Sequence, residues 1–141
     1  MRWMGISPLA VFLAGMACMV VGFLWYSPIL FAKPWMKGMG WDSVSAEQIA
    51  AAKKKAGPMY ALSLFFSFLT AAVLMKFFSA IGVHTSPKAL QIAGAAWLGF
   101  IMPVQATGAM FGRQKRVVFL INTAYQLVCM IASAAILAQF T

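Results

Sequence analysis

Acidic residues are nearly absent from this chain. Only two of its 141 residues, Asp42 and Glu47, are acidic, whereas eleven are Lys or Arg, so the net charge is +9. Neither acidic residue falls in an apolar run, and the one histidine, His84, has no carboxylate near it in sequence. Because general acid–base and nucleophilic catalysis both need a positioned titratable partner, no catalytic residue is predicted and an enzyme is not expected.

Metal-ligating and disulfide-forming residues are equally scarce. The sequence has no cluster of Cys, His and carboxylate residues, so the ligands of a dedicated zinc or iron site are missing, and neither a metal nor another cofactor is expected. The two cysteines, Cys18 and Cys129, both lie inside apolar runs. They are interpreted as small packing residues and not as a disulfide framework.

Apolar residues dominate what remains. They make up 63% of the chain and charged residues 9%, against roughly 45–50% and about 25% in soluble domains. A soluble fold of this size could not bury so much apolar surface, so the sequence predicts an all-α integral membrane protein of one domain. The basic residues lie between the apolar runs, which favours anionic lipid headgroups and not nucleic acid as their partner.

Four stretches are long enough to cross about 30 Å of hydrocarbon as helices. They cover residues 8–26, 59–82, 87–110 and 117–140. Ser7 is the predicted N-cap of the first span, with Pro8 at its first helical position. Gly57-Pro58 is predicted to open the second span and Gly82 to close it. Backbone exposed to lipid must satisfy its own hydrogen bonds, so each span is expected to be helical.

The loop at 27–57 is predicted to have structure of its own. Aromatic residues alternate with lysines, as in segments that lie in the headgroup layer, and the expected interfacial anchors are Trp25, Tyr26, Lys33, Trp35, Lys37 and Trp41. Farther on, Ser45 and Gln48 have the spacing of a capping box. A short helix over residues 46–55 should follow and end in three lysines, whose charge suits a helix C-terminus.

The distribution of Lys and Arg predicts an orientation. Eight of these residues lie in the first and third loops, and three lie on the other side of the spans. Because cytoplasmic loops carry the excess of positive charge, the long first loop is expected in the cytoplasm and both termini outside it. A multi-pass protein of a bacterial inner membrane fits this pattern.

Small residues recur every four positions in two spans and predict helix-packing faces. They are Ala14, Cys18 and Gly22 in the first span, and Ala95 and Gly99 in the third. Lipid gives helices little hydrophobic reason to associate, so small residues that let backbones approach carry the packing. The faces either meet within one four-helix unit or form the seam of a homo-oligomer.

Uncharged polar residues collect in the predicted cytoplasmic halves of three spans. The candidate polar cluster consists of Ser63, Ser67, Thr70, Gln105, Thr107, Asn122, Tyr125 and Gln126. Amides are costly in hydrocarbon unless paired, so these residues should turn inward and meet. They act either as hydrogen-bonding glue between helices or as a vestibule for a small solute or ion. Pro103 would add a free carbonyl, that of Gly99, to a vestibule.

A family resemblance rests on both ends of the chain. The stretch Gly22-Phe23-Leu24-Trp25-Tyr26-Ser27-Pro28, followed by Phe31, Lys33, Trp35-Met36 and Gly40, resembles the opening signature of the bacterial membrane family known as domain of unknown function 1761. Phe111, Arg113 and the later Leu120-Ile121-Asn122 and Tyr125-Gln126-Leu127-Val128 resemble its last span. Ala32 stands where that family usually has glycine. The resemblance implies a small four-span membrane protein and brings no activity or site residue.

The sequence therefore leaves two functions open. The protein either binds or conducts a small solute or ion through a polar cluster facing the cytoplasm, or it is a structural or assembly subunit of a membrane complex or homo-oligomer. A small proton-coupled exporter is disfavoured, because such carriers place an ionisable group within a span, and span one here has only apolar and small residues.

Overall fold

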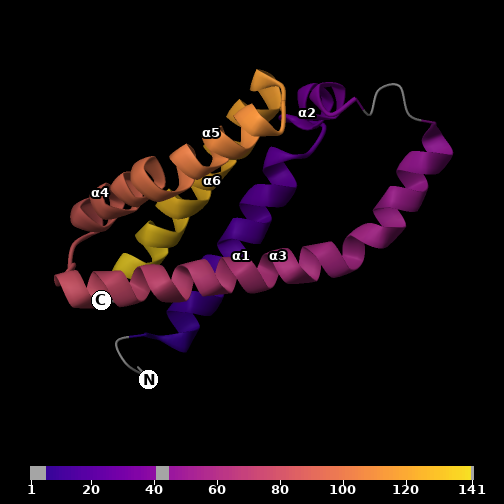
Figure 1. Ribbon diagram of the computed structural model, residues 1–141. Coiled ribbons are helices and arrows are strands. Elements are labelled where there is room, and N and C mark those ends of the chain that lie inside the picture. The colour runs from indigo at the N-terminus through magenta and orange to yellow at the C-terminus, as the bar shows by residue number, and fades with distance from the viewer. Residues whose placement is uncertain (1–5, 41–44, 141) are drawn as a thin grey trace.

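The computed structural model describes residues 6–40 and 45–140, and helices account for most of them (Figure 1). In chain order they are α1 (Pro8–Trp25), α2 (Ala32–Gly38), α3 (Ala46–Ile81), α4 (Ser86–Ala96), the π-helical turn η2 (Trp97–Ile101), α5 (Met102–Phe111) and α6 (Arg116–Ala138). Within these ranges four helical segments are long and apolar enough to cross a membrane. They are α1, α3, the composite α4–η2–α5, and α6, which confirms the all-helical class and the number of candidate spans.

Helix α1 begins where the sequence predicts. The Ser7 hydroxyl accepts a hydrogen bond from the Ala10 backbone N–H at 3.3 Å, and Pro8 occupies the first helical position, where its missing N–H leaves no bond unmade. The helix ends at Trp25, one residue before the predicted boundary.

Helix α3 differs from the prediction at its start. The capping box is confirmed, because Gln48 N donates to Ser45 Oγ at 3.3 Å and Ser45 N donates to Gln48 Oε1 at 3.2 Å. The expected break at Gly57-Pro58 is wrong, since one 36-residue helix runs through Pro58 to Ile81. Residues 50–56 are Ala and Lys, strong helix formers that carry the helix across the proline.

The consequence of Pro58 is a bend and not an end. A proline inside a helix removes one i→i−4 bond and pushes its ring against the preceding turn. Figure 1 shows α3 curving toward its N-terminal end, so its first turns project away from the other helices. The predicted short helix of residues 46–55 is therefore the start of α3. At the far end Gly82 closes the helix as predicted, in a left-handed conformation (φ 84°) that suits glycine.

The third span is not a continuous α-helix. The Met102 N–H donates to the Trp97 carbonyl five residues back, which makes the turn at Trp97–Ile101 a π-helix. It lies directly before Pro103, the residue that cannot donate to the carbonyl four positions earlier. Such bulges are a recurrent way for a helix to absorb an interruption in its hydrogen bonding. The sequence indicates the proline but not the extra residue in the turn.

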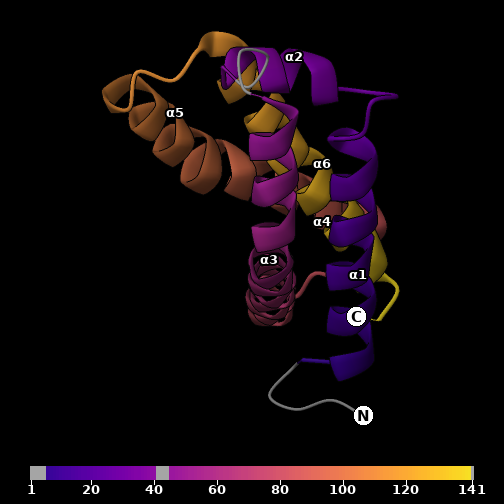
Figure 2. The same ribbon diagram turned by 90° about the vertical axis from the view of Figure 1, so that its right-hand side faces the viewer.

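Helix α6 is the centre of the fold. It contacts α1, α2, α3, α4, η2 and α5 (Figures 1 and 2). The apolar core surrounds its C-terminal half, where Phe78, Met75 and Leu137 are fully buried. Around its N-terminal half, side chains from α2 and the end of α1 hydrogen bond to α6.

The two predicted rows of small residues behave differently. In α1, Ala14 and Cys18 are buried, and Gly22 leaves room for the Tyr125 hydroxyl, which would lie 3.0 Å from a Cβ at that position. Ala95 and Gly99 are exposed, and nothing lies within 4 Å of a Cβ built on Gly99. The row in α1 thus packs against other helices of the chain. The row at Ala95 and Gly99 does not, so the expectation of contact within one four-helix unit is wrong for it.

Candidate functional site

The start of α6 is tied to the end of α1 and to α2 by three hydrogen bonds. Trp25 Nε1 donates to the Ile121 carbonyl at 2.9 Å, Tyr26 OH donates to Asn122 Oδ1 at 2.6 Å, and Trp35 Nε1 donates to the same oxygen at 3.2 Å. We call these five residues the Asn122 junction. One amide oxygen therefore satisfies two aromatic donors that come from different segments of the chain.

A tight reversal of the chain delivers these aromatic residues. After α1, Phe31 N donates to the Trp25 carbonyl at 3.1 Å, which folds the chain back over the end of the helix. Helix α2 then lies against α6 through Gly38, where a Cβ would lie 2.5 Å from Val118 Cγ2. The Tyr26 ring meets the Trp35 ring edge-on, with centroids 5.8 Å apart. Glycine at position 38 permits the approach that places Trp35 beside Asn122.

One cavity lies on the side of α6 that faces α1 and α3. We call it the α3 cavity; its volume is about 230 Å³, and hydroxyl, thiol and amide groups make up much of its wall. The lining residues are Cys18, Ser63, Phe66, Ser67, Thr70, Tyr125, Gln126, Cys129, Met130 and Ser133. The Ser67 hydroxyl is already satisfied, because it donates to the Ser63 carbonyl at 3.0 Å.

A second cavity lies on the side of α6 that faces α5. We call it the α5 cavity; its volume is about 320 Å³, and it is lined by Gln105, Gly108, Ala109, Gly112, Gln114, Phe119, Asn122 and Thr123. Two of its polar atoms are buried without a hydrogen-bonding partner, Gln105 Oε1 and Thr123 Oγ1. Thr123 is only 5% exposed. Buried polar atoms rarely remain unpaired, so these two are the unusual atoms of this region.

The predicted polar cluster is divided between the two cavities. Five of its members line the α3 cavity: Ser63, Ser67, Thr70, Tyr125 and Gln126. Gln105 and Asn122 line the α5 cavity, and Thr107 is exposed and lines neither. The expectation of a single meeting place is therefore wrong. Although Asn122 and Gln126 are four residues apart on α6, Asn122 lines the cavity beside α5 and Gln126 lines the cavity beside α1 and α3.

The predicted interfacial anchors also have partners within the chain. The polar atoms of Trp25, Tyr26 and Trp35 bond to α6, whereas Lys33 and Lys37 are exposed at the same end of the molecule. Trp41 lies outside the described residues. Anchoring at a membrane surface stays a prediction for the lysines, and the three rings have a structural role that the sequence pattern did not reveal.

Several residues of these sites were missed by sequence reasoning. Thr123 and Ser133 carry no signal that separates them from other span residues, and Trp35 resembles an interfacial tryptophan. Cys18 and Cys129 were assigned to packing, yet both line the α3 cavity. The signal that could have indicated the Asn122 junction is the presence of hydrogen-bond donors, Trp25 and Tyr26, at the end of one span and of an amide, Asn122, at the start of another.

The comparisons with known proteins agree with the family resemblance. Neither the curated proteins nor the solved structures include a match to this chain. One family model does match, and it covers residues 9–138, which include the Asn122 junction and both cavities. The chain therefore belongs to the family described as protein of unknown function DUF1761.

Proposed function

We propose that this chain is a four-span integral membrane protein that binds a small uncharged polar solute in the α5 cavity. The observation that carries the proposal is the unpartnered Thr123 Oγ1, which lies beside the cavity together with Gln105 Oε1. Leaving a buried polar atom unpaired costs about 1–3 kcal/mol. A solute that supplied the missing hydrogen bonds would recover that free energy on binding.

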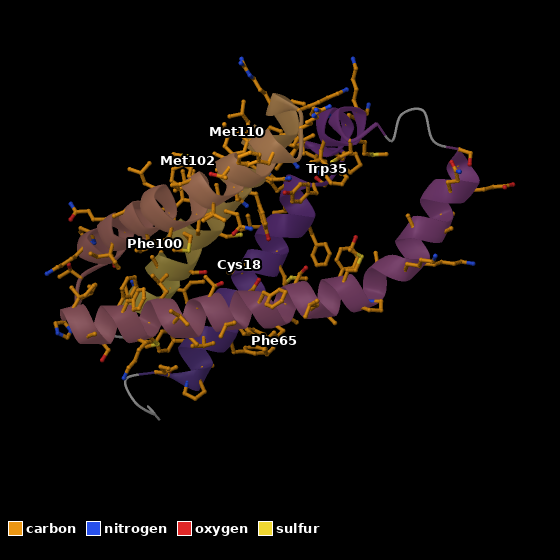
Figure 3. All side chains as sticks on the ribbon, viewed as in Figure 1. Cys18, Trp35, Phe65, Phe100, Met102 and Met110 are labelled. Atoms are coloured by element: carbon orange, nitrogen blue, oxygen red, sulfur yellow. The ribbon has the colours of Figure 1, made fainter. Side chains whose placement is uncertain are left out.

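The outer surface supports a membrane location. Large apolar side chains are exposed on each candidate span, among them Phe12 (52%), Phe65 (58%), Phe100 (72%) and Leu120 (62%). Figure 3 labels Phe65 on α3 and Phe100 in the η2 turn of the third candidate span. Apolar surface of this extent is typical of contact with lipid and not with water.

The lining of the α5 cavity indicates the chemistry of the solute. Its polar groups are the amides of Gln105, Gln114 and Asn122 and the Thr123 hydroxyl, and no charged side chain lines it. Because Asn122 Oδ1 is occupied by Tyr26 and Trp35, the Asn122 NH₂ group is the part of that amide left for a solute. A volume of about 320 Å³ is at the small end of ligand sites. Polyols and small carboxamides carry donors and acceptors of this kind.

Thr123→Val provides the test, because it keeps the shape of the side chain and removes the hydroxyl. Without ligand, the variant should melt at a higher temperature than the wild type, because it no longer buries an unpaired hydroxyl. The free energy of unfolding should rise by about 1–3 kcal/mol. With ligand, it should lose the thermal stabilisation that a panel of polyols and carboxamides gives the wild type in detergent. At a hundredfold excess over Kd that stabilisation is about 2.7 kcal/mol.

The matched control is Thr107→Val, which changes an exposed threonine of the neighbouring helix. It should leave both the melting temperature and the response to the panel unchanged. If no compound shifts the wild type, or if Thr123→Val still responds, the cavity does not bind such solutes. The second candidate, a structural or assembly subunit, would then be favoured, and the exposed Ala95 and Gly99 row is the observation that supports it. Stoichiometric co-purification with another membrane protein would identify that role.

The proposed orientation places the first loop in the cytoplasm of a bacterial cell and both termini outside. It is supported by the grouping of Lys33, Lys37, Arg113, Lys115 and Arg116 at one end of the molecule, where α2 meets α6 (Figure 1). A reporter that is active only in the cytoplasm should be inactive when fused after Thr141 and active when inserted near Gly57. The opposite pattern would reverse the orientation.

A further inference from the structure

The two cysteines of the chain meet across the contact between α1 and α6, although 111 residues separate them. Cys18 Sγ lies 3.7 Å from the Cys129 carbonyl oxygen, and Cys129 Sγ lies 3.9 Å from the Cys18 carbonyl oxygen. Each thiol therefore lies against the backbone of the residue that carries the other thiol. Figure 3 shows Cys18 about midway along α1, among the helices that surround the α3 cavity.

Two hydroxyl groups lie beside Cys18. Ser133 Oγ lies 3.1 Å from Cys18 Sγ, and Tyr125 OH donates to the Cys18 carbonyl oxygen at 3.3 Å. Ser133 is 2% exposed, so its hydroxyl is held in place by the surrounding helices. The Ser133 hydroxyl can donate to a thiolate as well as accept from a thiol. Thiols that only fill space do not require such neighbours.

The two cysteines are accessible from a cavity that is large enough to hold an ion with water. Both cysteines line the α3 cavity, whose volume of about 230 Å³ is several times the roughly 30 Å³ that one water molecule takes up in the liquid. Its other walls carry the hydroxyls of Ser63 and Thr70 on α3. An ion in this cavity would therefore lie between hydroxyl oxygens on α3 and the two thiols on α1 and α6.

We infer that Cys18 and Cys129 form a site for one soft monovalent cation, Cu(I) or Ag(I). Soft thiolate ligands select such ions, and a d¹⁰ monovalent cation is satisfied by two sulfurs in line, whereas zinc takes four ligands. In the described ranges no group of three or more His, Cys, Asp or Glu side chains could hold a metal ion, so a harder or higher-coordinate cation lacks its ligands. Two ligands are too few for zinc but are enough for an ion that binds only two.

Binding exchanges protons for the metal. Two S–H bonds break, two S–metal bonds form, and two protons leave, so the binding constant rises with pH. The product carries one net negative charge, which would be costly in an apolar interior. Ser133 Oγ, 3.1 Å from Cys18 Sγ, can donate to that sulfur once it is ionised and so spread the charge, as hydrogen bonds to an ionised group do.

Cu(I) binding to the reduced, purified protein in detergent tests the inference, with bicinchoninate as the competing chelator. The wild type should take one Cu(I) per chain from the chelator. The variants C18S and C129S, and the double variant, should each lose this competition. Ser133→Ala should keep the stoichiometry and bind about 10-fold more weakly, since residues that support metal ligands typically contribute 10- to 100-fold.

A second measurement covers the case in which a cysteine variant folds poorly. The sequence has two cysteines, so every thiol that reacts with a maleimide comes from this site. One equivalent of Ag(I) should protect both thiols of the wild type from alkylation together, with two protons released per ion. The chain also has eleven methionines; Cu(I) held as tightly by the double variant as by the wild type would assign the binding to thioethers and overturn the site. Alkylation of one thiol at full rate in the presence of Ag(I) would overturn it as well.

This inference is independent of the proposed solute site, which lies across α6 and uses other side chains. Thr123→Val should leave Cu(I) binding unchanged, and the cysteine variants should leave the response to polyols and carboxamides unchanged. Failure of one proposal can therefore be told apart from failure of the other.

Discussion

Asn122→Leu is expected to lower the melting temperature of the protein in detergent by about 5–10 °C. The substitution removes the one oxygen that accepts from both Tyr26 OH and Trp35 Nε1, at 2.6 and 3.2 Å. Each partly buried donor left unpaired costs about 1–3 kcal/mol. A single hydrogen bond within a membrane protein averages only about 0.6 kcal/mol. The effect should exceed that average because one substitution removes the acceptor of two hydrogen bonds.

The matched control is Gln126→Leu, the same change four residues along α6. Gln126 lines the α3 cavity and takes no part in the Asn122 junction. Its substitution should change the free energy of unfolding by no more than about 0.5 kcal/mol, as is usual for sites without a specific partner. Equal losses from the two leucine variants would mean that the Asn122 junction contributes nothing particular to stability.

A double-mutant cycle separates the hydrogen bonds from other effects of leucine. Tyr26→Phe removes one donor and keeps the ring, whereas Trp35→Phe removes the other donor and keeps a smaller aromatic ring. In that background Asn122→Leu should cost much less than in the wild type, and the difference is the coupling free energy. The comparison also bears on function, because an Asn122 that serves mainly as glue offers only its NH₂ group to a solute.

The helices themselves could be predicted because their signals are local. The span at Pro8–Trp25 is marked by a cap, a proline and an uninterrupted apolar run, and each acts within a few residues. The same holds for the capping box at Ser45 and the left-handed end at Gly82. Pro58 misled the prediction because the effect of one proline depends on its neighbours, and the alanines and lysines around it favour a helix strongly enough to continue.

The sites could not be predicted to the same degree because they depend on how α6 is surrounded. Periodicity places Asn122 and Gln126 on one side of a helix, but it does not say that α3 lies against one part of that side and α5 against another. The contact of Cys18 with Cys129 arises from the close approach of α1 and α6. No property of either cysteine's local sequence indicates that approach, and each alone is a small apolar residue.

Position 15 of α1 should show the largest effect of adding a single methyl group. Gly15 is buried against α3, and a Cβ there would overlap the Phe68 ring. Moving the ring away would also disturb its stacking on Phe12, whose centroid lies 5.9 Å away. Gly15→Ala should therefore lower stability by about 1–3 kcal/mol through overpacking, less the gain in helix propensity. Gly15→Leu should lower it further.

Gly94→Ala makes the same chemical change where there is space. Gly94 lies inside α4, and nothing lies within 4 Å of a Cβ built on it. Only the helix propensity changes there, so this variant should be stabilised by up to about 1 kcal/mol. The two alanine variants are thus expected to shift the melting temperature in opposite directions. In a Phe68→Leu background the loss from Gly15→Ala should shrink, because the atoms it would meet are removed. Shifts of the same sign for both glycines would mean that α1 and α3 do not approach as closely as Gly15 and Phe68 require.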